Sequence, residues 1–114
     1  MDLYHSEIRL PDGFVKPTGR VPLRWSRHAD GARLNDRYGE IRRFQSATLD
    51  RLDVIEVGVE NGRVVKILFR GRYDDERDVC MVLMPLRDAW LVKTVWVNLN
   101  SDAHKTLDHS RYVH

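Results

Sequence analysis

The sequence offers little from which a disulfide or a membrane span could be made. Its 114 residues contain one cysteine, Cys80, which lies in an apolar stretch. A disulfide framework is therefore excluded, and we expect the thiol to be a small buried hydrophobe in a reducing compartment. No apolar run approaches the roughly 20 residues that a bilayer-spanning helix needs. The sequence therefore predicts a soluble protein with no membrane partner.

Several local signals of targeting and of nucleotide binding are also missing. The opening residues, MDLYHSEIRL, lack the basic and continuous apolar regions of a secretory signal, so we expect the protein to stay in the cytoplasm. No glycine-rich phosphate loop and no dinucleotide fingerprint occurs anywhere in the chain. We therefore expect no nucleotide cofactor.

A metal site has only weak support. The C-terminal end offers His104, Asp108, His109 and His114 as ligands, but no cysteine pair accompanies them. Their spacing matches none of the closed zinc patterns. We therefore predict neither a bound metal nor another cofactor.

Length and charge are those of one small domain with a slight excess of positive charge. A chain of 114 residues can bury one core, so we expect a single domain over residues 1–114. The formal net charge is +2, and arginine dominates the basic residues. The planar guanidinium suits phosphate, which makes a nucleic-acid partner compatible with the composition without requiring one.

The strongest structural signal is an antiparallel sheet over residues 52–98. Asn61-Gly62 separates two runs rich in β-branched residues, and both positions of such a turn need a positive φ, which Asn and Gly tolerate. We therefore predict a hairpin there, with Glu60 and Arg63 as a cross-strand pair. Two further apolar stretches complete a four-stranded meander.

The region before the sheet contains one predicted helix. Residues 1–24 are interrupted by Pro and Gly, so we expect an irregular lead-in, with short edge pairing as an option around Arg20 to Arg24. Ser26 is a good N-cap for a helix over 26–39, and Gly39 stands where a left-handed residue would end it. Its weak apolar content favours small residues facing the sheet and a polar face outward.

Two segments are less well determined by the sequence. Residues 40–51 are equally compatible with an extended passage and with a short second helix capped by Ser46 or Thr48. Residues 99–114 form a polar tail with a final turn or short helix that Thr106 would cap. We expect Leu107 and Tyr112 of this tail to dock on the body of the protein.

These elements define an α+β fold. The expectation is a four-stranded antiparallel sheet, one or two N-terminal helices packed on one of its faces, and a short C-terminal turn or helix. Alternation at a period of two then groups the polar strand residues by face. Lys66 and Arg70 share one side of their strand, and Thr94, Trp96 and Asn98 point toward the more polar face. Whether Arg70 and Thr94 lie on the same face depends on the register across residues 73–78.

The order of motifs resembles a known group of small ribonucleases. A helix that begins Ser26-x-His28-Ala29 and contains Arg33 and the run 36–39 precedes a meander whose last strand reads Lys-Thr-Val-Trp-Val-Asn over 93–98. This arrangement is similar to the ribonuclease-toxin superfamily that groups RelE-like, barnase-like and colicin-type enzymes (the BECR fold). It also resembles uncharacterised proteins of actinobacterial phages. The resemblance covers roughly residues 24–112, and the tail motif Asp-His-Ser-Arg-Tyr is an addition to it.

The resemblance implies RNA cleavage without a metal, in a cytoplasm that would be the host's if a phage encodes the chain. It implies RNA as a partner, with a host protein or an antitoxin as further candidates. Such cleavage needs a base, an acid and cations that stabilise the phosphorane. The implied catalytic residues are His28, Arg33 and Thr94. The residues available to bind phosphate or to stack a base are Arg37, Lys66, Arg70, Trp96, Asn98, Arg111 and Tyr112. The alternative is a protein of the same scaffold without catalysis, which binds a host protein or nucleic acid through its basic face.

Overall fold

A computed structural model of the chain describes residues 1–102 and 107–114. The strands are β1 (Asp2–His5), β2 (Arg20–Trp25), β3 (Ser46–Thr48), β4 (Asp53–Glu60), β5 (Arg63–Arg72), β6 (Arg77–Pro85) and β7 (Trp90–Leu99). The helical elements are α1 (Arg27–Leu34) and two 3-10 turns, η1 (Leu49–Arg51) and η2 (His109–Arg111). In the described part of the chain, no helix is long and apolar enough to cross a membrane.

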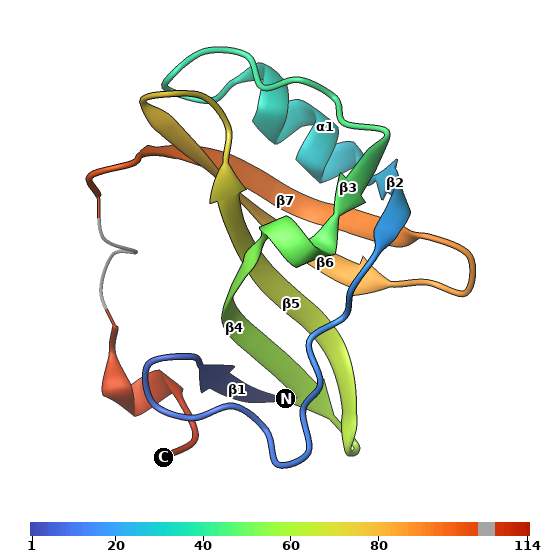
Figure 1. The fold of residues 1–114 in the computed structure, drawn as a ribbon, viewed down its shortest axis with the longest axis vertical. Coiled ribbons are helices and arrows are strands. Elements are labelled where there is room, and N and C mark those ends of the chain that lie inside the picture. Colours follow the sequence, from blue (N-terminus) through green and yellow to red (C-terminus); the bar gives the residue numbers. More distant parts are fainter. Residues whose placement is uncertain (103–106) are drawn as a thin grey trace.

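All seven of these strands belong to one mixed sheet, in the order β1-β4-β5-β6-β7-β2-β3. The strands β4 to β7 form the predicted antiparallel meander, whereas β2 runs parallel to β7. The expected α+β fold, with four strands and one or two N-terminal helices on one face, is therefore wrong. The described chain is mainly sheet and has a single α-helix (Figure 1).

The additional strands come from segments that looked irregular in the sequence. β1 pairs with β4, with Asp2 opposite Val59. β2 pairs with β3 as far as Pro22 and then with β7 from Leu23 onward. Proline has no N–H to donate, so it is tolerated at this change of partner but would break a continuous ladder. Pairing around Arg20 to Arg24, which the sequence allowed at an edge, is therefore present, but β2 lies inside the sheet between β7 and β3.

The Asn61-Gly62 hairpin is confirmed. Both residues have positive φ, 51° and 74°, and Glu60 lies opposite Arg63. No ion pair joins these two side chains among the described residues, so the turn conformation determines the register there.

Bulges change which side chains face the core. Between β6 and β7 the pairing shifts from Val82↔Thr94 to Leu83↔Val92, so Lys93 is an extra residue in β7. Val92 and Val95 are consequently both buried in the core, although simple alternation would put them on opposite faces. Thr94 keeps its expected face, because the bulge lies before it.

The helix begins as predicted and ends early. The hydroxyl of Ser26 accepts a 3.0 Å hydrogen bond from the Ala29 N–H, as an N-cap should. The helix stops at Leu34, before the predicted boundary at Gly39. The reason lies in Asp36, whose carboxylate accepts hydrogen bonds from the N–H groups of Tyr38 and Val97 and so turns the chain away from the helix.

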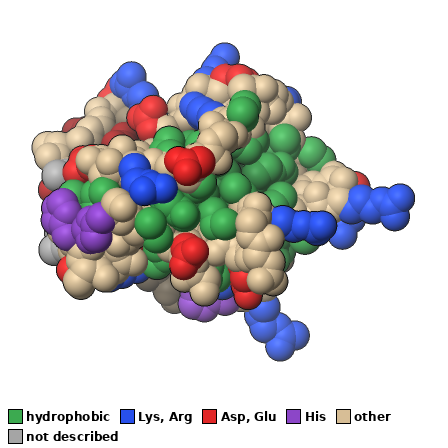
Figure 2. Space-filling view, turned by 90° about the horizontal axis from the view of Figure 1, so that it is seen from below, with side chains coloured by type: hydrophobic (Ala, Val, Ile, Leu, Met, Phe, Trp, Pro, Cys, Tyr) green, Lys and Arg blue, Asp and Glu red, His purple; other side chains and the backbone are tan. Residues whose placement is uncertain are grey.

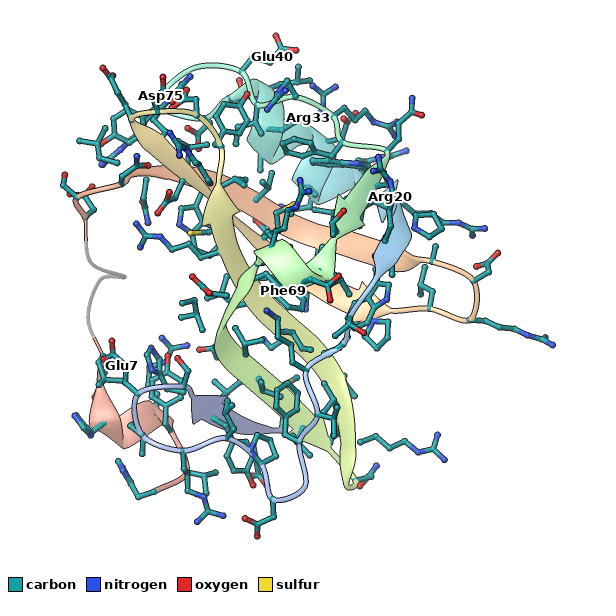
Figure 3. All side chains as sticks on the ribbon, viewed as in Figure 1. Glu7, Arg20, Arg33, Glu40, Phe69 and Asp75 are labelled. Carbon is teal, nitrogen blue, oxygen red and sulfur yellow. The ribbon has the colours of Figure 1, made fainter. Side chains whose placement is uncertain are left out.

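The helix α1 packs against β7 with its small residues inward, as expected. Ala29 is fully buried and Ala32 is half-buried against the core. The largest buried side chains of that core include Phe69, Ile41 and Leu49, and Figure 3 shows Phe69 in the middle of the molecule. Residues 40–51 form no second α-helix. They run extended through β3 and end in the single turn η1.

The tail returns to the N-terminal strand. The N–H of Val113 donates to Leu3 O at 2.9 Å, and Tyr112 is 6% exposed, which confirms that Tyr112 docks. Figure 2 shows the end of the molecule that carries β1, with hydrophobic side chains across its centre and histidines on the side of the C-terminus. Asp108 caps η2 by accepting from the Ser110 N–H. The predicted cap, Thr106, lies outside the described residues.

Candidate functional site

The polar strand residues predicted to act together lie on the face of the sheet that points away from the core, here called the outer face. The register pairs Arg70 with Cys80 and Cys80 with Trp96, and directly paired residues point to the same side. Val82 pairs with Thr94 in the same way. Arg70 and Thr94 therefore share a face. The members of the outer face that the sequence had singled out are Lys66, Arg70, Thr94, Trp96 and Asn98.

Three of these side chains are available to a ligand. Lys66, Thr94 and Trp96 are half-buried, and none of them makes a side-chain hydrogen bond or an ion pair to the described part of the chain. Lys66 lies flat over Gly58, where a Cβ would stand 2.8 Å from its Cγ. Its Cε lies 3.1 Å from the same position, and its ammonium has no partner among the described residues.

Arg70 is not available in the same way. Its Nε donates to Asp78 Oδ2 at 2.8 Å, and its Nη2 donates to Leu99 O at 3.2 Å and to Asp102 O at 2.7 Å. The side chain is 11% exposed. These bonds tie the end of β7 to the middle of the sheet, so the guanidinium has a structural role.

Asn98 and Cys80 form a second buried contact on this face. The Asn98 Nδ2 lies 3.8 Å from Cys80 Sγ. Cys80 is fully buried, and this burial raises the pKa of its thiol to about 11. A thiol that stays protonated at neutral pH is a poor nucleophile. Cys80 is therefore part of the packing, as the sequence predicted.

The C-terminal end adds a cluster at the β1 side of the outer face. The hydroxyl of Tyr112 donates to Glu56 Oε1 at 2.7 Å, and Arg111 Nη2 stands 3.8 Å from the same oxygen. The ring of Tyr112 meets that of His5 edge to face, with centroids 5.0 Å apart. Sequence reasoning placed Arg111 and Tyr112 near the site but missed Glu56 and His5. The available signal was a carboxylate at an outward position in the apolar middle of its strand.

The start of α1 lies beside β7, and the helix packs on the core side of the sheet, where Ala29 is buried with Val92 and Val95. The Ser26 N–H donates to Val92 O at 3.1 Å, and the Ser26 hydroxyl donates to Lys93 O at 3.2 Å. His28 follows in the first turn of the helix. It is exposed and has no hydrogen bond or ion pair to any described residue. The fold therefore brings the helix-start histidine and Thr94 onto neighbouring segments, and no hydrogen bond joins their side chains.

Arg33 and Arg37 are held away from the outer face. Arg33 binds Asp30 Oδ1 at 2.6 Å and Glu40 Oε1 at 3.3 Å, and its side chain is 14% exposed (Figure 3). Its hydrogen bond is the main reason why the pKa of Asp30 is lowered. Arg37 donates to the Tyr38 hydroxyl at 2.6 Å. These bonds hold both guanidinium groups at the loop after α1, and neither group bonds to a residue of the outer face.

The candidate metal ligands of the tail are not assembled into a site in the described residues. His104 lies outside them, and His109 and His114 stack on each other with centroids 5.7 Å apart. Among residues 1–102 and 107–114, no group of three or more His, Cys, Asp or Glu side chains is placed to hold an ion.

Comparison with known proteins finds no matching family, no similar curated protein and no similar solved structure. The resemblance to ribonuclease toxins therefore stays a prediction from short motifs.

Proposed function

We propose that the protein is a metal-independent endoribonuclease that binds RNA on the outer face of its sheet and cleaves it beside the start of α1. The observation that carries this proposal is the position of Ser26, which docks the helix start on Val92 and Lys93, next to Thr94. His28 is exposed and has no described partner, and it follows a residue that is docked on β7, the strand that also carries the unpartnered Thr94 and Trp96.

Each of these groups has a role in such a reaction. His28 takes the proton of the ribose 2′-hydroxyl as the 2′-oxygen attacks the phosphorus, and it then gives this proton to the 5′-oxygen that leaves, because histidine is the side chain used most often for such proton transfer. Lys66 and the half-exposed Arg111 attract the phosphate, and Trp96 offers a surface on which a base stacks. Thr94 positions the chain by hydrogen bonding. Arg33 and Arg70 act through the fold, because their guanidinium groups are occupied by protein acceptors.

Cleavage is tested by incubating the purified protein with total RNA in the presence of EDTA. We expect fragments that end in 2′,3′-cyclic phosphate, since attack by the 2′-hydroxyl leaves that group. His28→Ala should lower the rate by roughly 10² to 10⁴, the usual contribution of a proton-transfer group.

The matched control is Arg27→Ala, which removes an exposed positive charge one residue away and should change the rate only through binding. Its effect should disappear in saturating RNA, whereas that of His28→Ala should persist. Equal cleavage by wild type and His28→Ala would show that the histidine is misassigned. Complete absence of cleavage by the wild type would overturn the proposal.

A second candidate is a binding protein without catalysis on the same face. It is favoured by the engagement of Arg33 and Arg70 in structural ion pairs, which leaves few free cations beside His28. Fluorescence anisotropy with a labelled RNA distinguishes the two functions. Salt-dependent binding that Lys66→Ala weakens, without any cleavage, would support this candidate.

A further inference from the structure

A cavity on the core side of the sheet has no part in the proposed nuclease site. It lies between the segment that contains β3 and η1 and the adjoining ends of β5 and β6, and β3 and η1 cross those strands in Figure 1. Its volume is about 490 Å³, within the range of roughly 300 to 1,000 Å³ that is usual for small-molecule sites. The apolar part of its lining is Phe44, Ala47, Leu52, Val79 and Met81.

The walls of the cavity are held by contacts that require no ligand. The indole N–H of Trp25 donates to Phe44 O at 2.6 Å, and the Phe44 ring meets the Tyr73 ring edge to face at 6.1 Å. On the other side, Leu52 packs directly on Gly71, where a Cβ would lie only 2.3 Å from its Cδ2. The cavity is therefore preformed, which lowers the cost of binding.

The polar groups of the lining leave an excess of positive charge. Arg51 is exposed and makes no hydrogen bond or ion pair to the described residues. Arg72 forms an exposed pair with Asp75. The one carboxylate of the lining, Asp74, is bound by Arg77, whose Nε lies 2.8 Å from Oδ2, and this hydrogen bond lowers the pKa of Asp74.

Tyr73 supplies a directional donor. Its hydroxyl oxygen accepts a 3.2 Å hydrogen bond from the Arg42 N–H, and no described acceptor takes the hydroxyl proton. A free phenolic proton and an unpaired guanidinium around an apolar cavity suit a ligand with an apolar body and an anionic head.

We propose that this cavity binds a small amphipathic carboxylate, with its hydrocarbon body against Ala47, Val79 and Met81 and its carboxylate at Arg51. The proposal is independent of the nuclease function, because none of the residues assigned to RNA binding or cleavage lines the cavity.

The test compares three ten-carbon probes by isothermal titration calorimetry below their micelle-forming concentrations: decanoate, decanol and decyltrimethylammonium. We expect saturable one-to-one binding of decanoate, at least roughly tenfold tighter than of the other two. Arg51→Gln should weaken decanoate binding by roughly tenfold while leaving decanol unchanged. Arg63→Gln, an exposed arginine at the Asn61-Gly62 hairpin, is the matched control and should bind like wild type.

A second variant tests the position of the body. Ala47→Phe fills the cavity and should abolish binding of all three probes, with circular dichroism used to verify that the variant is folded. Equal affinity for the three probes, or unchanged decanoate binding by Arg51→Gln, would overturn the proposal. It would also be overturned by a concentration-dependent dimer that Ala47→Phe dissociates, because a second copy of the chain would then cover the cavity.

Discussion

The hydroxyl of Tyr112 donates a 2.7 Å hydrogen bond to Oε1 of Glu56, and this bond joins the C-terminal end of the chain to β4. The Glu56 side chain is only 12% exposed. The fold therefore depends on a residue close to the C-terminus to satisfy a carboxylate in the apolar middle of β4.

Removing this hydroxyl should destabilise the protein. Tyr112→Phe leaves the half-buried Glu56 with Arg111 at 3.8 Å as its remaining described partner. We expect the free energy of unfolding to fall by about 1–3 kcal/mol in urea denaturation. Tyr4→Phe is the control, because the Tyr4 hydroxyl makes no hydrogen bond to the described residues. Equal stability of the two variants would mean that the Glu56 bond contributes nothing.

The same tyrosine should make stability depend on pH in the alkaline range. Burial, followed by the hydrogen bond and charge of Glu56, raises the pKa of Tyr112 from 10.0 to about 12. Between these values the unfolded chain loses the phenolic proton while the folded protein retains it, so stability falls as the pH rises through this interval. Denaturation curves measured across it should show a smaller slope for Tyr112→Phe than for wild type. Parallel pH profiles would contradict the assignment.

Arg70 should prove to be a structural residue. Arg70→Ala leaves Asp78, 22% exposed, without its ion-pair partner and frees the carbonyls of Leu99 and Asp102. We expect a loss of about 3 kcal/mol in unfolding free energy. Arg63→Ala, at the exposed hairpin, should change stability by less than about 0.5 kcal/mol. If Arg70→Ala were as stable as wild type yet lost RNA cleavage, the arginine would act on the RNA directly.

Two glycines should respond in opposite directions to alanine. In Gly71→Ala the new Cβ would stand 2.3 Å from Leu52 Cδ2, so the side chain must move, and we expect a loss of about 1–3 kcal/mol. In Gly31→Ala, within α1, the Cβ meets nothing within 4 Å. That variant should gain about 0.5–1 kcal/mol from helix propensity. Thermal unfolding of both variants, compared with wild type, measures the two effects.

The local elements could be predicted because their causes lie within a few residues. Asn61 and Gly62 form the hairpin through their own tolerance of positive φ, and Ser26 caps α1 by bonding a residue three positions away. The face of Thr94 and Trp96 also followed from simple alternation. The sequence could not show whether each arginine is free to bind a ligand. Arg33 and Arg70 are occupied by acceptors that come together only in the folded chain.

The sheet as a whole was decided by contacts between distant parts of the chain. Leu23 pairs with Trp90 and Asp2 with Val59, and nothing near Leu23 or Asp2 in the sequence indicates these partners. The bulge at Lys93 likewise depends on β6, because an extra residue is defined only relative to the strand it pairs with. The sequence by itself determined the meander and its turns through local backbone preferences. The tertiary structure alone decided the seven-strand order, because long-range pairing selects among strands that are locally equivalent.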